Sequence, residues 1–348
     1  MTTSTTTMQA DDVATEGRSA AVHRDVLGAI GNTPVVRINR LAAETDAEVL
    51  AKLEFTNPGG SIKDRIGWWL IEDAERRGVL KPGGLVVEST GGNTGIGLAM
   101  AAAVKGYRCL FTMPDKMSPA KVKTLEAFGA EVVVTPTVAP PDPMNYCAVA
   151  RRIAAETPGS VYINQYDNLA NREYHYTHTG PEILRQGPDI DVLVAGLGTG
   201  GTLCGSGRFL KEHRPALKVI GVDPIGSILY DTYRYGDSGP AEFFYMEGIG
   251  KDYVPANMDF DLIDDVIQVG DKESFLMTRR LVKEEGIFAG VSSGAAILAA
   301  LRWLEGDADP AGKKVVVILP DSGSRYISKV YDDDWMRANG FLDEGGDR

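Results

Sequence analysis

Short apolar runs alternate with longer stretches of helical periodicity between about residue 85 and residue 319. The runs are rich in β-branched residues and do not alternate with polar ones, which is typical of strands buried on both faces of a parallel sheet. The predicted strands are Leu85–Glu88, Arg108–Met113, Glu131–Thr135, Val161–Ile163, Val192–Ala195, Lys218–Val222, Val266–Val269 and Lys314–Leu319. The predicted helices are Ile96–Lys105, Pro119–Phe128, Tyr146–Glu156, His178–Arg185, Thr202–His213, Lys272–Glu285 and Ala295–Glu305. This order predicts an α/β protein whose parallel sheets carry helices on both faces.

A proline-rich stretch, Pro136–Pro143, and the turn Thr157–Gly159 interrupt this alternation near the middle of the chain. Because proline and glycine end regular elements, they predict a domain boundary. We expect a smaller, mobile domain over residues 82–158 and a larger domain formed by residues 23–81 together with 159–342. The polar residues 1–22 and 343–348 are expected to be disordered tails.

Composition narrows the possible classes of protein. Of the 348 residues, 43% are hydrophobic and 24% are charged, as in ordinary globular domains, and the longest apolar runs are too short to cross a bilayer. The 36 Lys and Arg residues against 48 Asp and Glu residues give a net charge of −12, which disfavours binding to nucleic acid or to anionic membranes. The three cysteines are widely spaced, so neither a metal site nor a disulfide framework is expected. Because no export signal is visible either, we expect a cytoplasmic protein.

The segment Asn57–Arg65 is the first candidate for chemistry. Its Pro-Gly-Gly turn precedes a predicted helix that Ser61 can cap. Lys63 then lies in the first helical turn, where the helix dipole disfavours an ammonium group. Taken alone, Lys63 is most simply a surface lysine tolerated at a small cost. The alternative is an amine whose charge is removed by a lowered pKa or by an imine.

Two further segments open predicted helices. The turn Glu88–Gly97 follows a strand, so its free backbone N–H groups favour binding of an anion such as a carboxylate or phosphate. A plain glycine-rich turn explains it about as well. In Gly290–Gly294, Ser292 is most simply a residue that caps the following helix.

A third glycine-rich turn follows the predicted strand Val192–Ala195. Gly196, Gly198 and Gly201 satisfy the G-x-G-x-x-G pattern of dinucleotide-binding folds, and Asp223 follows about twenty residues later. A phosphate cup without a dinucleotide, made by backbone N–H groups and threonine hydroxyls, fits the same residues. The pattern does not separate the two, because both place phosphate at a helix N-terminus.

Taken together and in this order, the four segments resemble the fold-type II pyridoxal-phosphate enzymes of the cysteine synthase and cystathionine β-synthase family, over Ile30–Leu342. The resemblance implies a tryptophan-synthase-β-like fold with a smaller substrate-side domain and a larger domain that binds pyridoxal 5'-phosphate. It makes Lys63 the lysine that carries the cofactor. The other cofactor-binding residues that it implies are Asn93 at the ring hydroxyl, Gly198, Thr199, Gly200, Gly201 and Thr202 around the phosphate, and Ser292 at the pyridine nitrogen. For the substrate carboxylate it implies Thr90, Gly91, Gly92, Asn93, Thr94 and Gln165.

Within this family the cystathionine β-synthase branch is the most similar. The segments that resemble it are Lys116–Ser118, Asp223–Ser227, Glu247–Gly250, Pro320–Ser322 and Trp335–Leu342. Because the sequence ends there and shows no haem-binding segment, we expect a catalytic core without regulation by haem or by an adenosyl ligand. The resemblance also implies a homodimer.

The resemblance implies a β-replacement reaction on serine, O-acetylserine or O-phosphoserine through an α-aminoacrylate. A neutral Ser292 hydroxyl stabilises a protonated pyridine ring less than a carboxylate would, which favours loss of a β-leaving group over transamination. Lys63 is expected to remove and return the α-proton as the general base. Homocysteine is the expected nucleophile, with other thiols or amines as alternatives.

Two positions depart from the family. Gly91 replaces the serine of the usual Thr-Ser-Gly-Asn loop, and Lys251 stands where the branch more often has an aromatic or acidic residue. Lys251 is expected either to pair with an anionic substrate group or to be a solvated lysine. These changes keep open a specialised synthase of non-proteinogenic amino acids in secondary metabolism. A nucleotide-dependent oxidoreductase and a catalytically silent, cofactor-binding homologue are the remaining alternatives.

Overall fold

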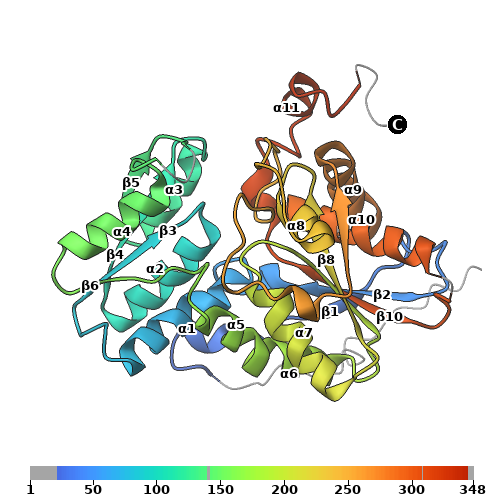
Figure 1. Ribbon diagram of the computed structural model, residues 1–348, viewed down its shortest axis with the longest axis horizontal. Coiled ribbons are helices and arrows are strands. Elements are labelled where there is room, and N and C mark those ends of the chain that lie inside the picture. The colour runs from blue at the N-terminus through green and yellow to red at the C-terminus, as the bar shows by residue number, and fades with distance from the viewer. Residues whose placement is uncertain (1–21, 139–141, 308, 344–348) are drawn as a thin grey trace, which may run out of the picture.

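Two sheets, lying side by side, form the framework of the protein (Figure 1). The computed structural model describes residues 22–138, 142–307 and 309–343. The predicted tails, 1–22 and 343–348, lie outside the described residues apart from Val22 and Asp343. Within the part of the chain that is described, no helix is long and apolar enough to span a membrane.

The smaller sheet has four parallel strands in the order β5-β4-β3-β6. Its strands are β3 (Leu85–Ser89), β4 (Arg108–Pro114), β5 (Glu131–Thr135) and β6 (Ser160–Tyr162), and its helices are α2 (Asn93–Lys105), α3 (Pro119–Ala127) and α4 (Tyr146–Glu156). All seven were predicted. β6 pairs with β3, so this sheet extends to residue 162. The division of the chain into domains at residue 158 stays a prediction.

The larger sheet has six strands in the order β1-β2-β10-β7-β8-β9. They are β1 (Val35–Arg37), β2 (Glu48–Leu53), β7 (Val192–Gly196), β8 (Lys218–Pro224), β9 (Asp265–Val269) and β10 (Lys314–Leu319). Only β1 runs antiparallel to its neighbour. β1 and β2 were not predicted, because β1 is very short and β2 carries the charged residues Glu48 and Lys52 in an otherwise apolar strand.

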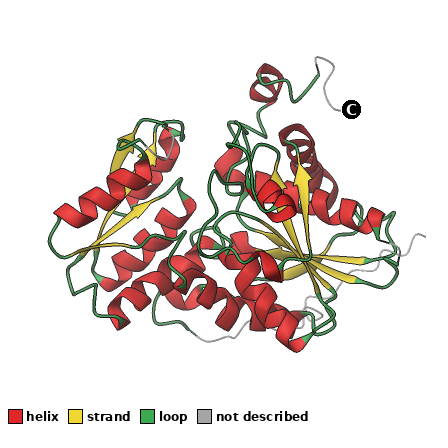
Figure 2. Ribbon diagram, in the orientation of Figure 1, coloured by secondary structure: helices red, strands yellow, loops and turns green. Residues whose placement is uncertain are grey.

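Helices cover both faces of the larger sheet (Figure 2). Along β10, Val315 and Val317 belong to the core formed with α10 (Val291–Gly306), whereas Val316 and Ile318 belong to the core formed with α7 (Gly201–His213). The other helices are α1 (Lys63–Arg76), α5 (Ala170–Tyr174), a π-helix (His175–Thr179), α6 (Gly180–Gln186), α8 (Leu229–Tyr235), α9 (Asp271–Glu285) and α11 (Asp333–Ala338). The predicted α/β class with parallel sheets is thereby confirmed.

A close contact between α1 and α2 joins the two halves of the molecule. A Cβ atom on Gly67 would lie 2.3 Å from the carbonyl carbon of Gly97, so only glycine permits this approach. Ile66, Leu70 and Ile71 of α1 pack into the core that α2 forms with the smaller sheet. Since α1 begins at Lys63, this packing places the start of α1 close to the start of α2.

Candidate active site

Lys63 is the first residue of α1 and is partly buried. Gly60, with a φ of +81°, completes the preceding turn, and the Ser61 hydroxyl accepts the N–H of Lys63 at 3.2 Å. Burial lowers the pKa of the Lys63 amine, and the carboxylates of Asp321 and Glu54 only partly oppose that effect. Within the described residues its Nζ forms no hydrogen bond or ion pair. The amine is therefore held in the protein with its polar end available to a ligand.

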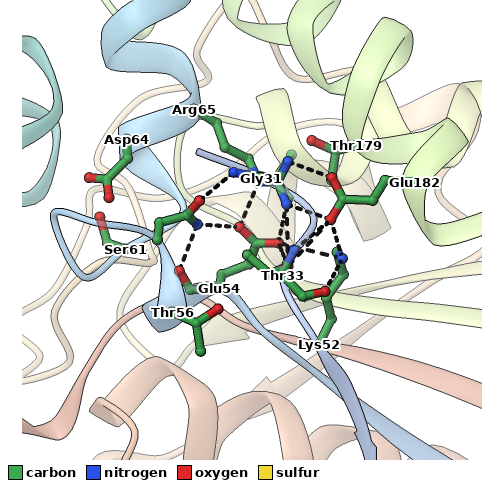
Figure 3. Close-up of polar contacts among 12 residues, drawn as sticks. Gly31, Thr33, Lys52, Glu54, Thr56, Ser61, Asp64, Arg65, Thr179 and Glu182 are labelled. Carbon is green, nitrogen blue, oxygen red and sulfur yellow. Dashed lines mark hydrogen bonds and ion pairs between the residues drawn. The ribbon is translucent and has the colours of Figure 1, made fainter. Parts of the chain in front are cut away.

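A buried ionic cluster fixes the helix that carries Lys63 (Figure 3). Arg65 Nε lies 2.7 Å from Glu54 Oε2, and Arg65 Nη2 lies 2.9 Å from Glu182 Oε1. Lys52 Nζ approaches the same Glu182 oxygen at 2.6 Å. The two positive and two negative charges cancel, which lowers the free-energy cost of burying four charged groups. The cluster ties α1 to β2 and α6, and the sequence analysis did not identify it.

The loop between β3 and α2 contains the predicted residues Thr90–Thr94. The Thr90 hydroxyl accepts the N–H groups of Gly92 at 3.1 Å and Gly95 at 3.3 Å. Gly92 has a φ of +136°, a conformation that only glycine adopts without strain. The Thr94 hydroxyl donates to Gln165 Oε1 at 2.6 Å. The loop and Gln165, separated by 71 residues in the sequence, therefore lie in contact.

Gly91 lies in this loop with free space beside it. A Cβ atom there would lie 3.6 Å from the nearest atom, the Cε of Met117, which is an ordinary contact. A serine at position 91, as in the family pattern, would therefore fit without rearrangement. The absence of the serine hydroxyl therefore changes the polar groups of the loop and does not relieve a steric clash.

Asn93 begins α2 and is held by two residues that follow β10. Its Nδ2 donates to Asp321 Oδ2 at 2.8 Å, and its Oδ1 accepts from Arg325 Nε at 2.6 Å. Asp321 also lies close enough to Lys63 to affect the pKa of its amine. Asp321 and Arg325 were not predicted as site residues. The visible signal was the position of Asp321 directly after a buried parallel strand, where sites in such sheets form.

The glycine turn between β7 and α7 forms a narrow cradle. Gly200 has a φ of +84°, and a Cβ on Gly198 would lie 2.8 Å from the carbonyl oxygen of Gly248. The Thr199 hydroxyl accepts Asn171 Nδ2 at 3.2 Å. Among the described residues, the N–H groups of Gly198, Thr199 and Gly200 donate to no protein acceptor. At the start of a 13-residue helix, such free donors favour an anion.

Two contacts connect this cradle to the rest of the site. The Thr202 hydroxyl lies 3.3 Å from His175 Nε2. Burial holds the pKa of His175 well below its ordinary value, and the positive charges of Arg65 and Lys63 add to the effect. Ser292, in the first turn of α10, is buried, and its Oγ would lie 3.7 Å from a Cβ on Gly248. Gly248 therefore lies next to both Gly198 and Ser292.

Lys251 lies beside the segment that follows Gln165. Its Nζ is 4.2 Å from the ring centroid of Tyr166 and 4.5 Å from that of Tyr253, as in cation–π contacts. Burial lowers the pKa of the Lys251 amine, while Asp252, with Oδ1 at 3.7 Å, raises it. The side chain is only 11% exposed, so the solvated lysine considered from the sequence does not describe it.

Comparison with known proteins identifies the family. Residues 26–321 match the family described as pyridoxal-phosphate dependent enzyme. Cystathionine β-synthase of Rattus norvegicus is 47% identical over 331 residues, which cover 94% of this chain and 58% of the relative. Cysteine synthase of Staphylococcus aureus is 43% identical over 301 residues, 86% of this chain and 94% of the relative. The chain belongs to the pyridoxal-phosphate dependent enzyme family. The predicted resemblance is confirmed.

The chain spans only part of some relatives. It covers 58% of the rat cystathionine β-synthase and 63% of that of Apis mellifera, whereas the bacterial cysteine synthase is matched over nearly its whole length. Family membership confirms pyridoxal phosphate as the cofactor. In the described part of the chain, no group of three or more His, Cys, Asp or Glu residues could hold a metal ion.

The residues present fit this cofactor. The unpaired N–H groups of Gly198–Gly200 suit a phosphate dianion, and a side chain at Gly198 would narrow that cradle. The buried, unpaired amine of Lys63 suits an aldehyde. The alternative of a dinucleotide site finds no support, because the buried carboxylate of Asp223 accepts the N–H of Tyr230 at 2.9 Å within its own turn.

Proposed function

We propose that this protein is a pyridoxal-phosphate enzyme that replaces the β-substituent of serine or an O-activated serine, as cystathionine β-synthase and cysteine synthase do. The observation that carries the proposal is that Asp321 connects Lys63, Asn93 and the start of α10, where Ser292 lies. Its carboxyl group accepts from Asn93 and affects the pKa of Lys63, and its carbonyl oxygen accepts the N–H of Gly290. The family match and the identity to both classes of enzyme support it.

Lys63 is proposed to hold the cofactor through Nζ and, once released, to act as the general base. When bound, pyridoxal phosphate would withdraw electrons from Cα of the substrate and so acidify its proton. Lys63 Nζ takes that proton, and the Cβ–O bond breaks with its electron pair leaving on the oxygen, as water after protonation, acetate or phosphate. The thiol or amine bonds to Cβ and gives up its own proton to the leaving group or to solvent, and Nζ returns the first proton to Cα. A lowered pKa increases the fraction of the free amine that is unprotonated at a given pH, as a base requires.

The remaining predicted residues receive binding roles. Gly198–Thr202 would hold the phosphate, and Asn93 and Ser292 would contact the ring hydroxyl and the pyridine nitrogen. Ser292 is proposed to favour β-replacement, because a neutral hydroxyl does not keep the pyridine nitrogen protonated. The N–H groups and hydroxyls of the Thr90–Thr94 loop, with Gln165, would hold the substrate carboxylate. The unit over residues 82–158 is proposed to close over the substrate and exclude water.

Lys251 is proposed to bind an anionic group of a substrate. Its amine is nearly buried between two tyrosine rings, and its contact with Asp252 is long at 3.7 Å. A phosphate leaving group or a carboxylate on the nucleophile would complete the compensation of its charge. Together with the extra space at Gly91, this supports a specialised amino-acid synthase as the second candidate, alongside homocysteine as nucleophile.

A product assay tests the proposed reaction. Purified protein with pyridoxal phosphate is incubated with serine, O-acetylserine or O-phosphoserine and with homocysteine, other thiols or amines, and the products are identified by mass spectrometry. We expect a β-substituted alanine from at least one pair, and none from Lys63→Ala. Lys123→Ala is the matched control, because Lys123 is 78% exposed and, within the described residues, pairs only with Glu126. Absence of product from every pair would contradict the proposal.

We further propose a cytoplasmic homodimer, as the family resemblance implies. A second copy could cover the partly exposed side chains of Trp68 and Trp69, whose rings pack edge to face with the buried Tyr174 beside a surface cavity of about 810 Å³. Light scattering should give twice the chain mass of 37.4 kDa, and a monomeric mass at micromolar concentration would contradict the dimer.

A further inference from the structure

Asp321 connects three parts of the site through its backbone. It follows β10, and its carbonyl oxygen accepts the N–H of Gly290, two residues before Ser292, at 2.9 Å. The carbonyl of the preceding Pro320 accepts the N–H of Ile62, next to Lys63, at 2.8 Å. Asp321 also forms an isolated β-bridge with Ser61. The starts of α1 and α10 are therefore both attached to this residue.

The Asp321 carboxyl group is buried, with 1% of the residue exposed. Oδ2 accepts two hydrogen bonds at 2.8 Å, one from Asn93 Nδ2 and one from the hydroxyl of Tyr326. Oδ1 is buried and has no partner among the described residues. It lies against Gly290, where an added Cβ would be 2.0 Å away. A buried carboxyl group with one unused oxygen is costly to keep, which indicates a role beyond packing.

The first consequence concerns the Asn93 amide. The Asn93 Nδ2 donates to Asp321, and the Asn93 Oδ1 accepts from Arg325 at 2.6 Å. The nitrogen and oxygen of this amide therefore cannot exchange places. Arg325 is itself held by the carbonyl of Gly59 at 2.6 Å. Asn93 Nδ2 keeps one further N–H, whose direction is then fixed. That remaining donor is the one available to the hydroxyl of the cofactor ring.

The second consequence concerns charge. Of the carboxylates that face Lys63, Asp321 has the largest effect and Glu54 the next, and both oppose the lowering of its pKa by burial. Burial raises the pKa of Asp321 above its ordinary value, and the hydrogen bond from Asn93, the charge of Arg325, the bond from Tyr326 and the charge of Lys121 only partly oppose that rise. A carboxylate with these partners is a suitable counter-ion for a lysine that alternates between bound and free states.

We propose that Asp321 is a positioning residue of the active site: it fixes the direction of the Asn93 donor and supplies the counter-charge of the free Lys63 amine. The proposal rests on the proposed function. Fixing the Asn93 donor needs only a hydrogen-bond acceptor at position 321, whereas balancing the charge of Lys63 needs a negative charge there. The two tasks can therefore be separated by substitution.

Two substitutions make the separation. Asp321→Asn keeps an acceptor for Asn93 and removes the charge, whereas Asp321→Ala removes both. For Asp321→Ala we expect the dissociation constant for pyridoxal phosphate, measured by fluorescence titration, to rise at least tenfold, the loss that corresponds to one hydrogen bond to a charged group. For Asp321→Asn we expect a rise of no more than about threefold, because the acceptor remains.

The pH profile tests the charge. The base must be unprotonated, so a lower pKa of Lys63 moves the acidic limb of kcat to lower pH. Because Asp321→Asn removes a negative charge that raises the pKa of Lys63, we expect the acidic limb to move to lower pH by about one unit. Asp223→Asn is the matched control: Asp223 also lies at the carboxyl end of a parallel strand and is buried with an Oδ1 that has no partner among the described residues. Its other oxygen accepts the N–H of Tyr230 within its own turn, and it does not affect the pKa of Lys63. It should leave both readouts unchanged.

The outcomes are distinct. The positioning role is overturned if the wild type makes product but both variants bind pyridoxal phosphate as tightly as the wild type does and keep the acidic limb of kcat at the wild-type pH. A pH limb that moves equally in Asp223→Asn would also overturn it. If the wild-type protein forms no product at all, the proposed function fails, while a tenfold loss of cofactor affinity confined to Asp321→Ala would still support the role toward Asn93.

Discussion

Replacing Arg65 by methionine removes the cation at the centre of the buried cluster beneath Lys63. The Arg65 guanidinium donates to Glu54 Oε2 at 2.7 Å and Oε1 at 2.8 Å, and to Glu182 Oε2 at 3.0 Å and Oε1 at 2.9 Å. Its side chain is fully buried. Methionine fills much of the same space without charge. Two buried carboxylates would then share a single cation, Lys52.

The expected loss of unfolding free energy can be worked out in two ways. Removing one member of a buried ion pair costs about 3–5 kcal/mol. For Glu182, burial raises the pKa, but the hydrogen bonds and charges of Arg65 and Lys52 outweigh it and lower the pKa from 4.5 to about 2. One pKa unit is about 1.4 kcal/mol, so this shift corresponds to about 3.5 kcal/mol, to which Arg65 and Lys52 both contribute. Because the pKa is lowered in the folded state, that stabilisation is present above pH 4.5 and lost as the pH falls toward 2.

Urea unfolding at pH 7.5, followed by far-ultraviolet circular dichroism, measures the change. Arg76→Met is the control, because Arg76 lies on the same helix, is 54% exposed and pairs with Asp73 at 3.4 Å. The control should lose no more than about 1 kcal/mol of unfolding free energy. Arg65→Lys, which keeps a charge without the planar fork, should lie between the two. An Arg65→Met protein as stable as the control would refute the reasoning.

The substitution Gly91→Ser should leave the melting temperature unchanged, because the new Cβ lies 3.6 Å from Met117, whereas Gly92→Ser should cost at least 1 kcal/mol at a φ of +136°; equal losses would contradict the geometry. Burial raises the pKa of Glu88 to about 8, so the folded state holds a proton that the unfolded state has released. Stability should therefore fall between pH 4.5 and 8, and urea unfolding of Glu88→Gln should lack that fall. Lys251→Met should raise KM for O-phosphoserine about tenfold more than KM for O-acetylserine, and a parallel rise for both would make Lys251 structural.

The order of the strands from β3 to β10 and of most helices between them could be predicted because their patterns are local, whereas the short helices α5 and α8 were not predicted. Apolar, β-branched runs such as Lys314–Leu319 are buried on both faces, and the helices between them are amphipathic or apolar. β2 was missed because Lys52 in its middle indicates exposure, yet Lys52 is buried by pairing with Glu182, 130 residues away. No local pattern shows such a partner.

The candidate site could likewise be predicted where its residues form local motifs, and not where it depends on contacts between distant residues. Gly198–Thr202 and Thr90–Thr94 could be proposed as site residues because four segments in one order resemble one family, although each glycine turn taken alone is ambiguous. Asp321 was not assigned to the site, since its contact with Asn93 joins residues 228 apart and appears only once both sheets are assembled. The burial of Lys251 between two tyrosine rings was likewise invisible from residue type, because an isolated lysine in a loop is ordinarily solvated.

The central claim is that pyridoxal phosphate is bound covalently by Lys63. Borohydride reduction of the cofactor-loaded protein, followed by intact-mass measurement and peptide mapping, tests it most directly. We predict a single pyridoxyl phosphate adduct on the peptide containing Lys63, absent from Lys63→Ala and retained in Lys123→Ala. An adduct on another lysine of the wild-type protein, or no adduct, would contradict the account.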